Sequence, residues 1–136
     1  MLNRSMLIVE GDRELLDMLC RRFIRGGFDV TPVHHPRQAL QAASFKDFQV
    51  AVLDVSLPET NGVALMQKLK RQIADLKVVL LSPHSDPAFE AEALEHGADA
   101  YFVKPCRLSE LEATIELAIH RQPEQVQVSA ACSYAS

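Results

Sequence analysis

Five short apolar runs rich in β-branched residues recur along the chain, and each is followed by a stretch with the length and apolar spacing of a helix. The pattern predicts strands over residues 6–9, 29–33, 50–55, 77–82 and 100–103. It predicts helices over about 12–25, from Pro36, over 63–73, from Asp86 to Gly97, and over 109–120. The last helix carries a capping-box pattern, Ser109 with Glu112.

The order of the strands follows from where apolar and breaking residues fall. Residues 50–53 and 78–81 are apolar at every position, so both faces of these central strands must be covered, as in a parallel sheet. Pro32 removes a ladder hydrogen bond and places its strand at an edge. We therefore expect an α/β fold, a doubly wound five-stranded parallel sheet in the flavodoxin-like order 2-1-3-4-5 with helices on both faces.

Composition bounds the class of protein. The chain has 136 residues, 48% hydrophobic and 24% charged, which is typical of one globular domain; we place this domain at residues 1–120 and expect a flexible tail or the start of a linker at 121–136. A net charge of -4 with dispersed basic residues argues against direct nucleic acid binding. The absence of long apolar runs argues against membrane association, so we expect a cytoplasmic protein with reduced cysteines.

Chemistry-bearing residues follow the predicted strands. Glu10 and Asp12 follow the first, Asp54 ends the third, Ser82 ends the fourth and Lys104 follows the fifth. The carboxyl ends of parallel strands meet at one crevice. Carboxylates suit a hard cation such as Mg²⁺, and a lysine and a hydroxyl suit phosphate oxygens. The arrangement predicts phosphoryl transfer with Asp54 as the nucleophile.

Some of these residues, and Tyr101 in the last predicted strand, could have a structural role in place of a chemical one. An unpaired charge at the end of a buried strand costs several kcal/mol, which favours a functional Asp54. Glu10 and Asp12 could equally bind metal or cap the first helix. Tyr101 could fill the core. An enzyme of another class is disfavoured, because the chain has neither a G-x-S-x-G elbow nor a Walker P-loop.

The sequence resembles the receiver domains of two-component response regulators from about residue 6 to 119. The resemblance rests on order and spacing in six segments: Leu7-Ile8-Val9-Glu10, Val52-Leu53-Asp54-Val55-Ser56-Leu57-Pro58, Asn61-Gly62, Leu80-Leu81-Ser82, Gly97-Ala98-Asp99-Ala100-Tyr101 and Lys104-Pro105.

This resemblance implies that Asp54 accepts a phosphoryl group from a histidine kinase or phosphotransfer protein. Catalysis would be at most autocatalytic transfer and self-dephosphorylation. It also implies a metal site of Glu10, Asp12, Asp54 and the Ser56 backbone carbonyl, and a cis Lys104-Pro105 peptide.

The family signals through a hydroxyl and an aromatic residue, here Ser82 and Tyr101. They act on the face of the fourth helix, fifth strand and fifth helix, where Phe89, Ala93 and Leu111 are the candidate surface residues. An effector domain or protein, and a homodimer through the fourth and fifth helices, are the implied partners.

Three positions depart from the family pattern. Gly11 replaces the acidic residue that normally contacts the metal, which leaves the Mg²⁺ affinity open, with Glu10 and Asp12 as alternatives. Pro83 lacks the backbone N–H that normally binds a phosphoryl oxygen. Cys106 replaces a common phenylalanine. The first two departures keep open a pseudo-receiver that binds proteins without phosphorylation.

Overall fold

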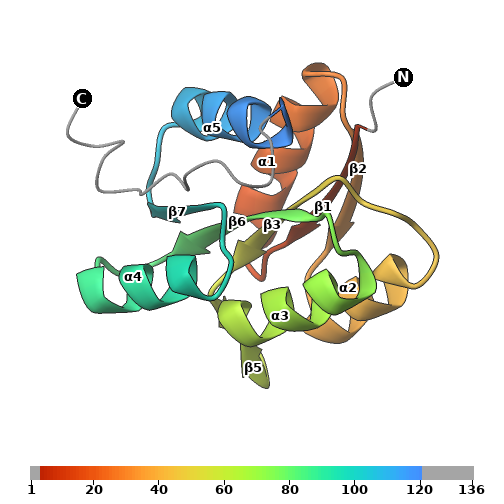
Figure 1. Ribbon diagram of the computed structural model, residues 1–136. Helices are drawn as coiled ribbons and strands as arrows, with labels where there is room; N and C mark the ends of the chain where they lie inside the picture. The colour runs from red at the N-terminus through yellow and green to blue at the C-terminus, as the bar shows by residue number, and fades with distance from the viewer. Residues whose placement is uncertain (1–3, 121–136) are drawn as a thin grey trace.

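A five-stranded parallel sheet lies between two layers of helices (Figure 1). The structure is a computed structural model that describes residues 4–120. The strands of this sheet are β1 (Ser5–Val9), β2 (Asp29–Val33), β3 (Val50–Asp54), β6 (Lys77–Ser82) and β7 (Ala100–Val103). The helices are α1 (Arg13–Arg25), α2 (Pro36–Ala43), α3 (Gly62–Gln72), α4 (Pro87–Glu95) and α5 (Leu108–His120).

The strand order is β2-β1-β3-β6-β7, which confirms the predicted 2-1-3-4-5 order. β2 is an edge strand, as Pro32 indicated, and Pro32 lies in register with Ile8 of β1. β3 lies at the centre, and each of its residues is buried. The carboxyl ends of all five strands therefore point to the same edge of the sheet, where the predicted site residues lie.

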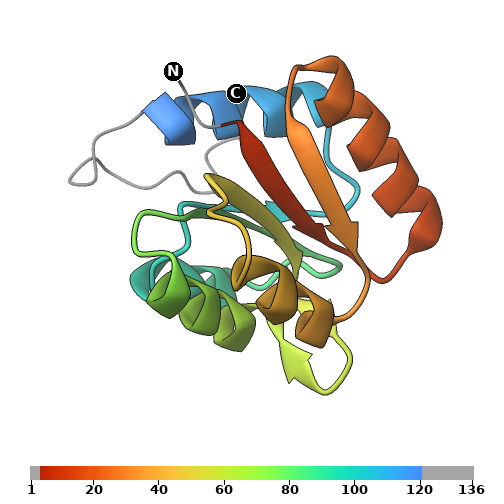
Figure 2. The same cartoon turned by 90° about the vertical axis from the view of Figure 1, so that its right-hand side faces the viewer.

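The two faces of the sheet are covered by different helices. α1 and α5 lie on one face, and α2, α3 and α4 lie on the other (Figures 1 and 2). Successive side chains of a strand point to opposite faces, so Ile8 and Val52 pack in the α1–α5 core whereas Leu7 and Leu53 pack in the other. Both cores are needed to bury the strands, which explains their continuous apolar sequence.

A short hairpin after β3 was not predicted. It pairs β4 (Ser56–Leu57) with β5 (Thr60–Asn61) and protrudes beside α3 (Figure 2). Glu59 turns the chain with a φ of 66°, and the buried Leu57 anchors the hairpin to the core. Strands of two residues are too short to show alternation in the sequence.

Gly62 begins α3 directly against the chain that carries Asp54. A Cβ at this glycine would lie 2.8 Å from Val55 Cα and 2.9 Å from the Asp54 carbonyl oxygen. The Gly62 N–H donates to the Val55 carbonyl oxygen at 3.1 Å. Only glycine allows this approach, so Gly62 fixes the backbone of the Asp54 segment.

The predicted capping box of the last helix is wrong. α5 begins at Leu108, and the Arg107 carbonyl accepts from the N–H groups of Glu110 and Leu111 at 3.1 Å each. Ser109 therefore lies inside the first turn and cannot cap the helix. The remaining helices begin within about one residue of their predicted starts, and α1, α3 and α4 end within about two residues of their predicted ends.

The described residues bear differently on the predicted tail and on membrane association. The expected tail at 121–136 lies outside the described residues. Within residues 4–120, no helix has the length and apolar character needed to cross a membrane.

Candidate functional site

Three ionisable side chains gather at the carboxyl edge of the sheet. Glu10 follows β1, Asp54 ends β3 and Lys104 follows β7. Glu10 is 1% exposed and Asp54 is 6% exposed. β1 and β3 are neighbours, so the two carboxylates come from adjacent strands, and the Lys104 N–H donates to the Ser82 carbonyl at 2.7 Å. The structure thus brings together three of the residues that the sequence placed at one crevice, Glu10, Asp54 and Lys104.

Lys104 contacts both buried carboxylates. Its Nζ donates to Glu10 Oε1 at 2.8 Å and lies 3.5 Å from Asp54 Oδ2. The lysine side chain is 21% exposed, whereas those of Glu10 and Asp54 are 2% and 7% exposed. Charges removed from water in this way need a partner, and one ammonium serves both carboxylates.

Glu10 has protein partners on both of its oxygens. Oε1 accepts from Lys104, and Oε2 accepts from the Asp12 backbone N–H at 3.0 Å. Burial raises the pKa of Glu10, while the hydrogen bonds from Lys104 and Asp12 act in the opposite direction. The negative charge of Asp54 adds to the effect of burial, so the pKa of Glu10 is raised overall, and Lys104 and the Asp12 N–H fix the position of its two oxygens.

Asp54 is oriented by the chain that follows it. Its Oδ1 accepts from the Ser56 N–H at 3.0 Å, and its Oδ2 faces Lys104. A carboxylate oxygen beside a fixed ammonium is suited to attack an electrophile whose negative charge the ammonium can neutralise. This arrangement makes Asp54 the candidate nucleophile of the site.

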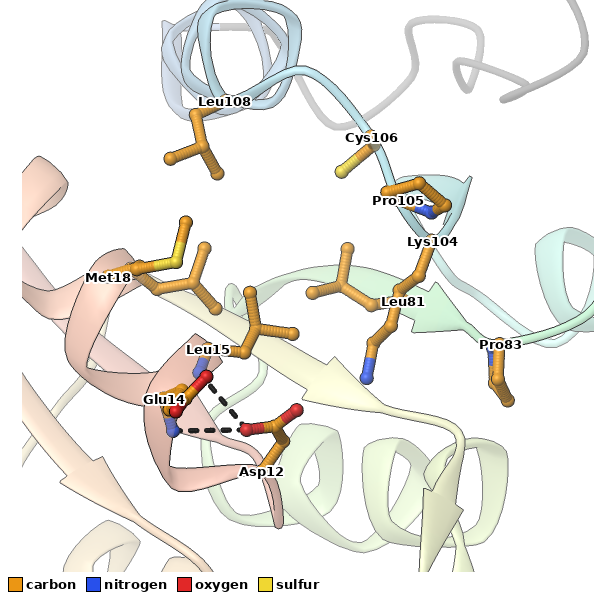
Figure 3. A pocket seen from close by; sticks show the side chains of 11 residues that line it. Asp12, Glu14, Leu15, Met18, Leu81, Pro83, Lys104, Pro105, Cys106 and Leu108 are labelled. Atoms are coloured by element: carbon orange, nitrogen blue, oxygen red, sulfur yellow. Dashed lines mark hydrogen bonds between the residues drawn. The ribbon is translucent and has the colours of Figure 1, made fainter.

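Asp12 caps α1. Its Oδ1 accepts from the N–H groups of Glu14 at 3.0 Å and Leu15 at 3.2 Å, as the dashed lines of Figure 3 show. The Asp12 side chain is exposed. Of the two interpretations that the sequence left open for this residue, the structure shows capping.

Ser82 is engaged in a local turn. Its Oγ donates to the His84 carbonyl at 2.8 Å and accepts from the His84 N–H at 3.2 Å. Ser82 is 4% exposed, and the intervening Pro83 is exposed. The serine must leave this turn before it can donate to a group bound at Asp54.

Tyr101 is completely buried between α4 and the sheet. Its ring contacts Phe89 edge-on, with centroids 6.1 Å apart. Within the described part of the chain, no hydrogen bond of good geometry reaches its hydroxyl. Burial raises the pKa of Tyr101, and the neighbouring Ser82 hydroxyl opposes this effect. Tyr101 therefore fills the core, as one of its two interpretations predicted.

The sequence comparison decides the family. Residues 6–116 match the family model of the response regulator receiver domain. The chain belongs to the receiver domain family. The family also accounts for the cis Lys104-Pro105 peptide, which the resemblance predicted and the structure contains.

The chain is similar to parts of longer proteins. The chain is 32% identical over 121 residues to the transcriptional regulatory protein TctD of Salmonella typhimurium, covering 89% of this chain and 54% of TctD. It is 33% identical over 120 residues to the transcriptional regulatory protein GltR of Pseudomonas aeruginosa, covering 87% of this chain and 50% of GltR. The chain thus spans about half the length of these relatives.

A solved structure with the same fold is the receiver domain of Francisella response regulator 1452. It is 25% identical to this chain, with a TM-score of 0.81, and the match covers 88% of this chain and 98% of that one.

Part of the predicted signalling surface is wrong. Ala93 and Leu111 are completely buried, because Ala93 of α4 and Leu111 of α5 face the sheet from opposite layers. Phe89 is only half-buried. Leu117 of α5 is instead a large apolar residue on the surface, with 64% of it exposed.

The residues near Asp54 fit a divalent cation poorly. Receiver domains typically bind a divalent metal. Here Glu10 is held by Lys104 and the Asp12 N–H, Asp12 caps α1, and Gly11 has no carboxylate. Among residues 4–120, no three His, Cys, Asp or Glu side chains are grouped so that they could hold a metal ion.

A cleft of about 430 Å³ opens between the start of α1 and the segment that leads from Lys104 to α5 (Figure 3). The Cys106 sulfur points into it, and burial raises the pKa of this thiol. The cleft is lined by Asp12, Glu14, Leu15, Met18, Leu19, Leu81, Pro83, Lys104, Pro105, Cys106 and Leu108.

Proposed function

We propose that this receiver domain accepts a phosphoryl group on Asp54 from a histidine kinase or phosphotransfer protein. The observation that carries the proposal is the buried Asp54 carboxylate with its Oδ2 3.5 Å from the Lys104 ammonium. Membership of the receiver family supports the same role.

In the proposed reaction, Asp54 Oδ2 attacks phosphorus while the bond from phosphorus to the donor nitrogen breaks. The leaving nitrogen keeps the electron pair and takes up a proton, and Lys104 neutralises charge on the phosphoryl oxygens. Ser82 would donate to one of these oxygens after leaving its turn with His84. Pro83 cannot donate, and the missing charge-assisted hydrogen bond would weaken the phosphorylated state by about 1.5 to 3 kcal/mol.

Magnesium is the cation that the family resemblance suggests. The predicted ligand set stays a prediction; it comprises Glu10, Asp12, Asp54 and the Ser56 carbonyl. To form it, Glu10 would have to leave Lys104 and the Asp12 N–H, and Asp12 would have to leave the first turn of α1. A Mg²⁺ titration tests this set directly.

Signalling would proceed through the face formed by α4, β7 and α5. In this proposal, phosphorylation draws Ser82 toward Asp54, the buried Tyr101 adjusts with it, and the face changes its preference for an effector domain, an effector protein or a second copy of the chain. The proposed place of action is the cytoplasm, where histidine kinases present their phosphohistidine.

A pseudo-receiver that binds a protein partner without phosphorylation is the second candidate. It is favoured by the absence of an acidic side chain at Gly11 and of a backbone donor at Pro83. The retained Asp54, Lys104 and Ser82 favour the phosphoacceptor.

The test is intact-mass measurement after incubation with phosphoramidate or a phosphorylated kinase. The parent and Asp75→Ala, which changes an exposed aspartate, should gain one phosphoryl group, and Asp54→Ala should gain none. A folded parent that gains no phosphoryl group from either donor would favour the pseudo-receiver.

A further inference from the structure

We infer that Glu10 serves to hold Lys104, and that the Lys104 ammonium supplies at Asp54 the positive charge that a divalent cation supplies in other receiver domains. Glu10 is thus a positioning residue rather than a metal ligand. The part of this inference that concerns phosphorylation rests on the proposed function of Asp54.

The contacts of Glu10 carry the inference. Lys104 Nζ lies closer to Glu10 Oε1, at 2.8 Å, than to Asp54 Oδ2, at 3.5 Å. The second oxygen of Glu10 is held by the Asp12 N–H. With its side chain 2% exposed, Glu10 could bind a cation only by giving up these partners, and Lys104 would lose its shortest contact.

The charge of the crevice agrees with this role. The two buried carboxylates beside the reacting oxygen already share one ammonium group, that of Lys104. Asp12, the other nearby carboxylate, is exposed and bonded to the first turn of α1. A hard divalent cation favours several charged oxygen ligands, and this crevice offers none that is not already engaged.

The same contacts prepare Lys104 for the reaction. A fixed ammonium next to the nucleophile is oriented before the phosphoryl donor arrives, so no reorganisation is needed when negative charge develops on the transferred oxygens. As the phosphorus–oxygen bond to Asp54 forms and the phosphorus–nitrogen bond of the donor breaks, the Lys104 ammonium, held by Glu10, lies beside the transferred phosphoryl oxygens.

Gly11 provides a clean way to test the inference. A Cβ at this exposed position would meet no atom within 4 Å, so an added side chain has room. Gly11→Asp restores the carboxylate that the family pattern has, and Gly11→Asn has nearly the same shape without the charge. The two variants separate the effect of charge from that of size.

The first experiment is a Mg²⁺ titration of the unphosphorylated chain, followed by the amide NMR signals of Asp12 and Ser56. The amide signals of the parent and of Gly11→Asn should show no saturable change up to about 10 mM Mg²⁺. Gly11→Asp should bind Mg²⁺ with a dissociation constant at least about tenfold below that limit. Saturable binding by the parent in this range would overturn the inference, whatever the outcome for Asp54.

The second experiment compares phosphoramidate labelling in EDTA and in Mg²⁺. The labelling rate of the parent in EDTA should lie within about twofold of its rate in Mg²⁺. Glu10→Gln should lower the labelling rate in EDTA by about tenfold or more. Asp17→Asn, which removes an exposed carboxylate of α1, should leave the rate unchanged.

The outcomes separate the two proposals. Labelling of the parent in Mg²⁺ that is lost in EDTA would overturn the inference and leave the function of Asp54 intact. A folded parent that is labelled in neither medium by phosphoramidate, nor by a phosphorylated kinase, would overturn the proposed function and, with it, the catalytic role of Lys104. Equal labelling of Glu10→Gln and the parent would overturn the role of Glu10 as a positioning residue.

Discussion

Glu10 and Lys104 lie 94 positions apart in the sequence and form an ion pair of 2.8 Å whose carboxylate side chain is 2% exposed. Replacing Lys104 by methionine should leave Glu10 and Asp54 buried without a cation. We expect Lys104→Met to lower the free energy of unfolding by about 3 to 5 kcal/mol at neutral pH, measured by urea denaturation.

A double-mutant cycle tests this pairing. The double variant Glu10→Gln/Lys104→Met should be more stable than Lys104→Met alone, because one of the two uncompensated carboxylates is gone. Additive effects of the two single substitutions would show that Glu10 and Lys104 are not coupled.

Gly62→Ala should destabilise the fold by about 1 to 3 kcal/mol, because its Cβ would overlap the backbone of Val55 and Asp54. The same variant should slow labelling of Asp54, since the segment that carries the nucleophile must shift. Gly11→Ala is the matched control. Its Cβ would meet open space, so its stability should remain within about 0.5 kcal/mol of the parent.

Tyr101→Phe should be as stable as the parent or more stable by up to about 1 kcal/mol, because the buried hydroxyl lacks a hydrogen-bond partner in the described part of the chain. Tyr101→Ala should lose about 3 to 5 kcal/mol, since it empties a core position. Urea denaturation of the three proteins gives both values. A clear loss of stability in Tyr101→Phe would show that the hydroxyl has a partner in solution.

Arg4 and Glu116 should produce a measurable dependence of stability on pH. The two hydrogen bonds from the Arg4 guanidinium, both of 3.0 Å, lower the pKa of Glu116 from its ordinary value of 4.5. A lowered carboxyl pKa stabilises the folded state above the ordinary value, and this contribution is lost as the pH falls through the lowered pKa.

Glu116→Gln should therefore be less stable than the parent at neutral pH, by less than about 1 kcal/mol because the pair is partly exposed. The two stabilities, measured by urea denaturation at several pH values, should converge in acid. A difference that persists unchanged in acid would assign the effect to packing.

Cys106→Phe should raise the melting temperature. The Cys106 sulfur points into the cleft between α1 and the start of α5, and a ring placed there would contact the apolar side chains of Leu15, Met18 and Leu108. Filling such a space commonly adds about 0.5 to 2 kcal/mol. Cys106→Ser has nearly the size of the parent and serves as the control, and a melting temperature of Cys106→Phe below that of Cys106→Ser would show that the cleft cannot accept the ring.

The sequence was sufficient to predict the sheet and the crevice. Continuous apolar runs marked the central strands, Pro32 marked an edge, and the parallel topology brought Asp54 and Lys104 together without any knowledge of side-chain positions. These features depend on the spacing of apolar residues and on the direction of the strands, and both can be inferred from the local sequence.

Other features depend on choices between nearby partners, which the sequence does not record. Asp12 could have faced Asp54, but three-dimensional packing placed it at the first turn of α1. The preference of Lys104 for Glu10 depends on side-chain geometry across the sheet. Ser109 is not the N-cap of α5, because the helix already begins at Leu108.

The open space around Gly11 has an evolutionary consequence. Every glycine codon becomes an aspartate or glutamate codon through a single base change, and a Cβ at this position would meet no atom within 4 Å. A population that carried this gene would thus have short mutational access to a cation-dependent form of the same protein. Persistence of glycine at this position among close descendants would indicate selection for signalling that does not vary with the magnesium content of the cell.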